Sequence, residues 1–199
     1  MQASSTHPLL ILSEIDSACR EIIGKTSTPL LPDKNTWSGI GFRIGKDQLV
    51  IQNIYIDEVV DANFRRNLSI VPGAKAWLIG LISLRGQPLA VIDFKQFLFG
   101  EASIPTEHSR LVVIKNDNYI SGLFLEDVCG LKQFEENTDS RNNKKNDQNK
   151  KMDADEINKL FSENISLYID KTFSDDGALC GNLSIPRLIS NTDFANAAR

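Results

Sequence analysis

Histidine and cysteine are scarce in this 199-residue sequence, and their scarcity argues against metal and disulfide chemistry. The cysteines Cys19, Cys129 and Cys180 are far apart and form neither a CxxC pair nor a disulfide framework. We expect them to be free, partly buried thiols. Neither His7 nor His108 has a cysteine nearby in the sequence, so a zinc site has little support.

Long apolar runs and an excess of basic charge are also missing. No apolar run reaches the roughly 18–20 residues needed to cross a bilayer, and the N-terminus lacks the basic start and cleavage site of a secretory signal. The net charge of -4 and the pI near 5.3 do not suggest a general nucleic-acid binder. We therefore expect a cytoplasmic protein that neither inserts into a membrane nor binds nucleic acid.

Catalytic and cofactor motifs are absent as well: no glycine-rich phosphate loop precedes a helix, and neither GxSxG nor HExxH occurs. We predict no cofactor. Asp93, at the end of "AVID", could serve as a phosphoacceptor or bind a ribose, but both uses need parallel strands with crossover helices. Here strands follow strands, so we interpret Asp93 as a structural carboxylate that could pair with Arg85 across a hairpin.

The first 36 residues differ in pattern from the rest. Apolar residues recur at helical spacing over 9–23, Gly24 is a plausible stop, and 25–36 is polar and rich in proline and threonine. We expect an N-terminal helix and linker at 1–36, followed by one domain at 37–199.

From residue 39 the period of the pattern changes to two. In "GIGFRI", Ile40, Phe42 and Ile44 alternate with Gly41 and Arg43, as in a half-buried strand. Many short segments of this kind favour an all-β fold of antiparallel strands in a barrel or sandwich. No internal repeat is clear enough to use. We predict strands at 39–44, 48–52, 54–60, 68–71, 78–84, 88–93, 110–116 and 119–128. The acidic pair within 54–60 could also fit a short helix.

The segment 135–156 has almost no apolar residues, and we expect it to be disordered. Its basic residues could touch an acidic partner or nucleic acid, but acidic residues flank them and no aromatics are interleaved for base stacking. A short helix is predicted within 154–165, a final hairpin turning at Asp176-Gly177, and a last turn or helix from Pro186 to Leu188.

Glu58, in "IDEVV", stands among apolar residues. It is either a rim carboxylate whose neighbours Ile56 and Val59 pack inward, or an acidic group at the lip of an apolar groove that selects a partner by charge.

Three blocks resemble the CheW-like domain family. They are "FRIGKDQLVIQNIYIDEVV", "VPGAKAWLIGLISLRGQPLAVIDF" and "YISGLFLEDVCGL", spread over residues 39–131. "IDSACR" and "WSGIGFRIG" are similar to the branch of that family that serves type IV pili and twitching motility. Ser83 stands where the family often has asparagine, and the insertion at 135–156 is longer than a typical connection.

The resemblance implies a fold of two small five-stranded barrels packed together, with short helices near the C-terminus. It implies a non-enzymatic adaptor, which links the cytoplasmic tips of membrane-anchored chemoreceptors to the regulatory domain of a CheA-type histidine kinase. The receptor's helical hairpin would lie in an apolar groove between the barrels. The residues that match the family's partner-binding positions are Ile56, Glu58, Gly80, Arg85 and Leu131.

Two rival functions remain open at this point. One is a phosphoacceptor or enzyme that uses Asp93, and the other is a small-barrel nucleic-acid binder that uses the basic segment. Within the family, a flagellar chemosensory pathway also remains an alternative to a pilus pathway.

Overall fold

The computed structural model describes residues 36–117, 119–135, 154–175 and 178–196. The helix predicted at 9–23, most of the polar insertion at 135–156 and the Asp176-Gly177 turn lie outside the described residues. The described residues from Trp37 onward form one compact unit. None of the described helices is long and apolar enough to cross a membrane.

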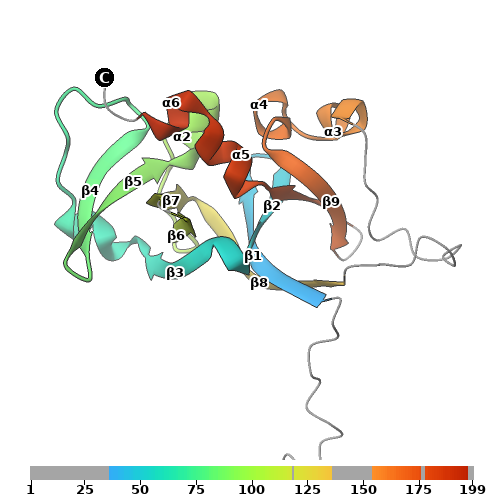
Figure 1. The fold of residues 1–199 in the computed structure, drawn as a ribbon, viewed down its shortest axis with the longest axis horizontal. Coiled ribbons are helices and arrows are strands. Elements are labelled where there is room, and N and C mark those ends of the chain that lie inside the picture. Colours follow the sequence, from blue (N-terminus) through green and yellow to red (C-terminus); the bar gives the residue numbers. More distant parts are fainter. Residues whose placement is uncertain (1–35, 118, 136–153, 176–177, 197–199) are drawn as a thin grey trace, which may run out of the picture. The chain divides into compact units, whose positions relative to one another are not determined.

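Two five-stranded sheets dominate the described part of the chain, which confirms the predicted all-β fold class (Figure 1). The first sheet has the strand order β8-β1-β2-β10-β9 and the second has the order β3-β6-β7-β5-β4. The first sheet contains β1 (Thr36–Ile44), β2 (Asp47–Gln52), β8 (Asp127–Glu135), β9 (Ile169–Asp175) and β10 (Ala178–Leu183). The second contains β3 (Ile56–Asp61), β4 (Leu78–Leu84), β5 (Gln87–Asp93), β6 (Arg110–Asn116) and β7 (Tyr119–Leu125).

The two sheets have the same topology, because exchanging β1–β5 with β6–β10 in order turns one strand order into the other. The described part of the chain therefore consists of two five-strand repeats. Each sheet contains the first two strands of one repeat and the last three strands of the other. The expectation of wholly antiparallel barrels is wrong for one pair in each sheet, since β2 with β10 and β5 with β7 are parallel. Long connections between these strands make the parallel pairing possible.

Contacts between edge strands close each sheet on itself. In the second sheet, Ser69 and Leu81 exchange two backbone hydrogen bonds of 2.8 Å, and Ser69 lies on the chain that continues from β3 toward β4. In the first sheet, Lys132 Nζ of β8 lies 2.8 Å from Asp175 Oδ2 of β9. Both sheets thus curl into small barrels, as the family resemblance implies.

The alternating sequence pattern of the strands fills three cores. On β6, Leu111 and Val113 face the interior of the second barrel, whereas Val112 and Ile114 belong to a core shared by both sheets. This period of two follows from the opposite directions of successive strand side chains. The interior of the first barrel contains Val50, Phe134, Phe173 and Cys180.

Short helices add to the shared core. The helices predicted near the C-terminus are present as α3 (Ala154–Leu160), α4 (Glu163–Ser166) and α5 (Ile185–Ser190), and α6 (Thr192–Ala195) follows them. Helix α2 (Phe94–Phe99) and the 3-10 turns η1 (Asn53–Tyr55) and η2 (Ala62–Asn67) were not predicted. The strand predicted at 68–71 is wrong: only the isolated Ser69–Leu81 bridge forms, because η2 runs to Asn67 and Pro72-Gly73 follow, which leaves only a short extended stretch.

Candidate functional site

Arg85 occupies the turn between β4 and β5. Leu84 pairs with Gln87, so Arg85 and Gly86 alone form the loop, with φ values of 50° and 80°. Positive φ at both positions defines a type I′ turn, whose twist matches that of the flanking strands. The turn directs Arg85 away from the sheet, and 72% of its side chain is exposed.

Glu58 lies on β3, where inward and outward residues alternate. Ile56, Glu58 and Val60 are half-buried, whereas Val59 is exposed, so Val60 rather than Val59 packs inward. A register shift between Ile56 and Glu58 marks a bulge in the pairing with β6. Only 22% of the Glu58 side chain is exposed. The carboxylate therefore sits at the edge of the apolar interior instead of projecting freely into water.

Glu58 and Arg85 form an ion pair. Arg85 Nη2 donates to Glu58 Oε2 at 2.7 Å, while Glu58 Oε1 is buried and has no hydrogen-bond partner among the described residues. Because the guanidinium is mostly solvated, the pair contributes no more than about 1 kcal/mol to stability. Its outward N–H groups and the second carboxylate oxygen leave hydrogen-bonding capacity beyond what the pair itself uses.

Gly80, unlike the charged pair, lies where two backbone segments of the second barrel approach each other closely. It is buried on β4 with a φ of 154°, and a Cβ atom at this position would lie 2.4 Å from Ser69 O. Only glycine therefore allows Ser69 to approach Leu81 and close the second barrel.

Leu131 lies on β8 of the first sheet, away from the other four predicted residues in the topology, and is 59% exposed. Its neighbour Lys132 makes the ion pair with Asp175. The structure thus brings Glu58 and Arg85 into contact and places Ile56 beside them on β3, packed against the shared core. A hollow of about 470 Å³ next to Ile56 is lined by Ile54, Tyr55, Ile56, Asp57, Lys115, Asn116 and Asp117.

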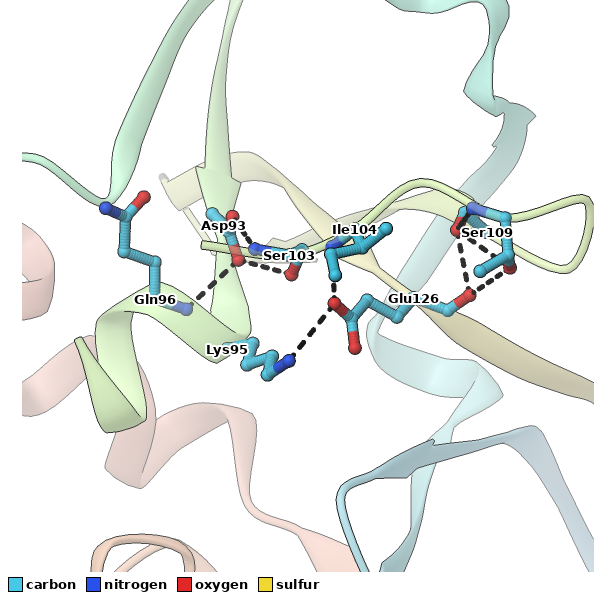
Figure 2. A network of polar contacts seen from close by, with 8 residues as sticks. Asp93, Lys95, Gln96, Ser103, Ile104, Ser109 and Glu126 are labelled. Atoms are coloured by element: carbon cyan, nitrogen blue, oxygen red, sulfur yellow. Dashed lines mark hydrogen bonds and ion pairs between the residues drawn. The ribbon is translucent and has the colours of Figure 1, made fainter. Parts of the chain in front are cut away.

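Asp93 is a structural carboxylate, as predicted (Figure 2). Its Oδ1 accepts hydrogen bonds from Gln96 N at 3.0 Å and Ser103 Oγ at 2.6 Å, and its Oδ2 accepts one from Ser103 N at 2.8 Å. The residue is 3% exposed and caps α2. The predicted pairing with Arg85 is wrong, because Arg85 and Asp93 stand at opposite ends of β5, about 20 Å apart at roughly 3.4 Å per residue.

Sequence reasoning missed the polar contacts around Asp93. Figure 2 shows Glu126 accepting from the backbone N–H of Ile104 and meeting Lys95 Nζ at 3.3 Å. These bonds fasten the segment after α2 to the end of β7. The sequence did hold helix-end signals for α2: an aspartate directly before residues 94–99 and a glycine, Gly100, directly after them.

A scan against protein-family models matches residues 38–157 to the CheW-like domain. The chain belongs to the CheW-like domain family. The paired barrels of this CheW-like chain extend beyond the match on both sides, since β1 begins two residues before it and β9 and β10 follow it.

Two curated relatives of the CheW-like chain agree with this assignment. Protein PilI of Pseudomonas aeruginosa is 30% identical over 128 residues, which is 64% of this chain and 69% of PilI. Chemotaxis protein CheW of Rhizobium meliloti is 26% identical over 92 residues, which is 46% of this chain and 57% of that protein.

Among solved structures, the scaffolding protein TtCheW from Thermoanaerobacter tengcongensis has a similar fold, with a TM-score of 0.58 and 15% sequence identity. The alignment covers 81% of this chain and 91% of that one. At this identity the likeness supports the fold alone, and it agrees with the predicted pair of barrels.

Proposed function

We propose that this CheW-like chain is a non-enzymatic adaptor that couples chemoreceptors to a CheA-type histidine kinase. The similarity to PilI favours a chemosensory system that controls type IV pili. In this proposal the protein works in the cytoplasm, at arrays of membrane-anchored receptors.

The observation that carries the proposal is the Arg85–Glu58 pair at the end of the second barrel. An amphipathic receptor helix can place its apolar residues against Ile56 and Leu131, in a groove between the barrels. Glu58 and Arg85 then select orientation and partner by charge, which affects specificity more than affinity. The buried Glu58 oxygen without a partner supports this role, because a receptor donor could satisfy it after a small movement.

The kinase regulatory domain would bind a second surface. Individually weak contacts, on the order of micromolar, suffice in an array, because neighbouring contacts raise the effective concentration. The adaptor's contribution is then geometric: it holds the kinase where receptor movement can bias its activity.

Charge reversal tests the proposed site. We expect Glu58→Arg and Arg85→Glu each to lower recruitment by receptor tips in a pull-down assay and to impair pilus-dependent motility. The double exchange, Glu58→Arg with Arg85→Glu, restores an internal ion pair with the charges inverted. If a partner reads these charges, the double variant binds as poorly as the single variants.

The matched control is the ion pair of the first barrel, exchanged as Lys132→Asp with Asp175→Lys, which occupies the equivalent position in the other repeat. Recruitment should survive this exchange. Two results would contradict the proposed site: full binding by both single variants of the second barrel, or recovered binding in their double exchange. Either would mean that the Glu58–Arg85 pair only stabilises the second barrel.

The absence of catalysis is part of the proposal and has its own test. Burial of Asp93 and occupation of both its oxygens by hydrogen bonds disfavour a phosphoacceptor role. We expect the purified protein to gain no acid-labile phosphate when it is incubated with an autophosphorylated CheA-type kinase. Labelling that disappears in Asp93→Asn would favour the phosphoacceptor instead.

A further inference from the structure

The C-terminal helices connect the two barrels. Helix α5 begins directly after β10 of the first sheet, and Arg187 Nη1 donates to Ile169 O of β9 at 2.7 Å. Ile185 and Leu188 of α5 are buried in the shared core. The next helix, α6, lies beside α2, which follows β5 of the second sheet (Figure 1).

Phe194 anchors α6 on the second barrel. It is 1% exposed, and its ring stacks on Trp77, with centroids 6.2 Å apart and an interplanar angle of 9°. The same ring meets Phe97 edge-on at 5.0 Å and lies 6.1 Å from Tyr119. Trp77 leads into β4, Phe97 lies on α2 and Tyr119 begins β7, so these three aromatic contacts all go to elements of the second barrel.

Asn191 attaches the other end of α6 to the first barrel. Its Oδ1 accepts hydrogen bonds from the backbone N–H groups of Asp193 and Phe194, at 2.8 and 3.1 Å, and so caps the helix. Its Nδ2 donates to the hydroxyl of Tyr168, the residue before β9, at 2.9 Å. One short helix is therefore attached to both barrels by two side chains that are three residues apart.

We propose that Phe194 is a positioning residue and that α6 is a latch that fixes how the two barrels are placed relative to each other. Phe194 belongs to the shared core and to neither barrel interior. Its loss therefore leaves each barrel's own packing in place while it removes an anchor between them.

The latch bears on partner binding because the predicted surface spans both sheets. Ile56, Glu58 and Arg85 belong to the second barrel, whereas Leu131 belongs to the first. A helix that contacts all four needs the barrels at one fixed placement, which the latch supplies. This last step rests on the proposed adaptor function, whereas the latch itself does not.

The test measures the placement of the barrels directly. Nitroxide labels are attached at Ser83→Cys on β4 and Gln133→Cys on β8, both exposed, after Cys19 and Cys129 have been changed to serine. Pulsed electron–electron double resonance then gives the distribution of distances between the two labels, one on each barrel. We expect Phe194→Ala to broaden or shift this distribution and Phe194→Leu, which keeps most of the apolar bulk, to restore much of it.

Phe173→Ala is the matched control, because Phe173 is equally aromatic and buried but packs inside the first barrel against Trp37 and Phe134. It should lower thermal stability without changing the distribution. An unchanged distribution in Phe194→Ala, or equal broadening in Phe173→Ala, overturns the latch. If Phe194→Ala does not fold, Asn191→Ala, which removes the cap and the bond to Tyr168, is judged by the same two criteria.

Affinity for a receptor tip, measured on the same variants, tests the link to function. We expect at least about a fivefold loss in Phe194→Ala relative to Phe173→Ala, the lower range for coupling between distant sites. Equal affinities would refute the effect of the latch on binding. A wild-type protein that binds no tip would refute the adaptor function, and the distance measurement would still decide the latch.

Discussion

Replacing Gly80 with alanine should disrupt the contact between Ser69 and Leu81 that closes the second barrel. The added Cβ would lie 2.4 Å from Ser69 O, well inside normal contact distance, and the atom it meets belongs to the backbone. Ser69 must then move away from Leu81, with which it exchanges two hydrogen bonds of 2.8 Å. Each bond contributes about 0.5–1.5 kcal/mol, and alanine at a φ of 154° costs about 1–3 kcal/mol.

We therefore expect Gly80→Ala to lower the free energy of unfolding by about 2–6 kcal/mol in urea titrations followed by circular dichroism. Gly86→Ala is the control: Gly86 has a φ of 80° but no atom within 4 Å of its added Cβ, so only backbone strain of about 1–2 kcal/mol applies. Amide exchange should accelerate at Leu81 in Gly80→Ala and stay unchanged there in Gly86→Ala. A loss in Gly80→Ala no larger than that in Gly86→Ala would refute the close approach as the reason for this glycine.

Two further predictions concern buried groups. Asp93→Asn should lower the unfolding free energy by about 1–3 kcal/mol, because an amide N–H₂ then faces the groups that donated hydrogen bonds to the carboxylate. A smaller loss than in Ser103→Ala, which removes the side-chain bond alone, would contradict this. Burial raises the pKa of the Cys180 thiol to about 12, and the nearby Asp175 adds a smaller effect. In a Cys19→Ser background, iodoacetamide at pH 8 should therefore modify the exposed Cys129 and leave Cys180 unmodified until the protein unfolds. Because the thiol ionises near pH 9 in the unfolded chain, its contribution to stability is complete below pH 9 and declines as the pH rises toward 12. Cys180→Ala should lack that part of the decline in urea titrations at pH 8 and 10.

Local pattern was enough to predict the strands around Arg85. Alternation on 78–84 and 88–93, interrupted at Arg85-Gly86-Gln87, predicts both strands and a tight turn. The structure has β4 and β5 there within one residue, with Gln87 in β5 instead of the turn. The charged pair was harder to assign. Glu58 and Arg85 are 27 residues apart, and nothing in their local sequence shows that β3 and the β4–β5 turn meet when the barrel closes. Asp93, eight residues from Arg85, was the nearer candidate along the chain and the more distant one in space.

The pairing of strands from different repeats could not be predicted from the sequence, for a related reason. The period of two tells which face of a strand is buried, but Val112 and Leu111 are equally apolar, and burial on both faces hides which core each side chain joins. The chain changes sheets over short connections, at Asn53–Tyr55 between β2 and β3 and at Glu126 between β7 and β8, and nothing local in the sequence marks the change. Helix α2 was missed because "FKQFLF" has only 6 residues, which is too short a window to distinguish a helical period.

The repeated topology also bears on partner choice. Each barrel has an ion pair between the third strand of one repeat and the hairpin that follows it, yet the order of charges is inverted. Glu58 is on the strand and Arg85 on the hairpin in one barrel, whereas Lys132 is on the strand and Asp175 on the hairpin in the other. A helix that brings an acidic group toward Arg85 would meet Asp175 if it bound the equivalent surface of the first barrel. Like charges at that position disfavour binding. A charged partner can therefore distinguish the equivalent ends of the two barrels, although both barrels have the same topology.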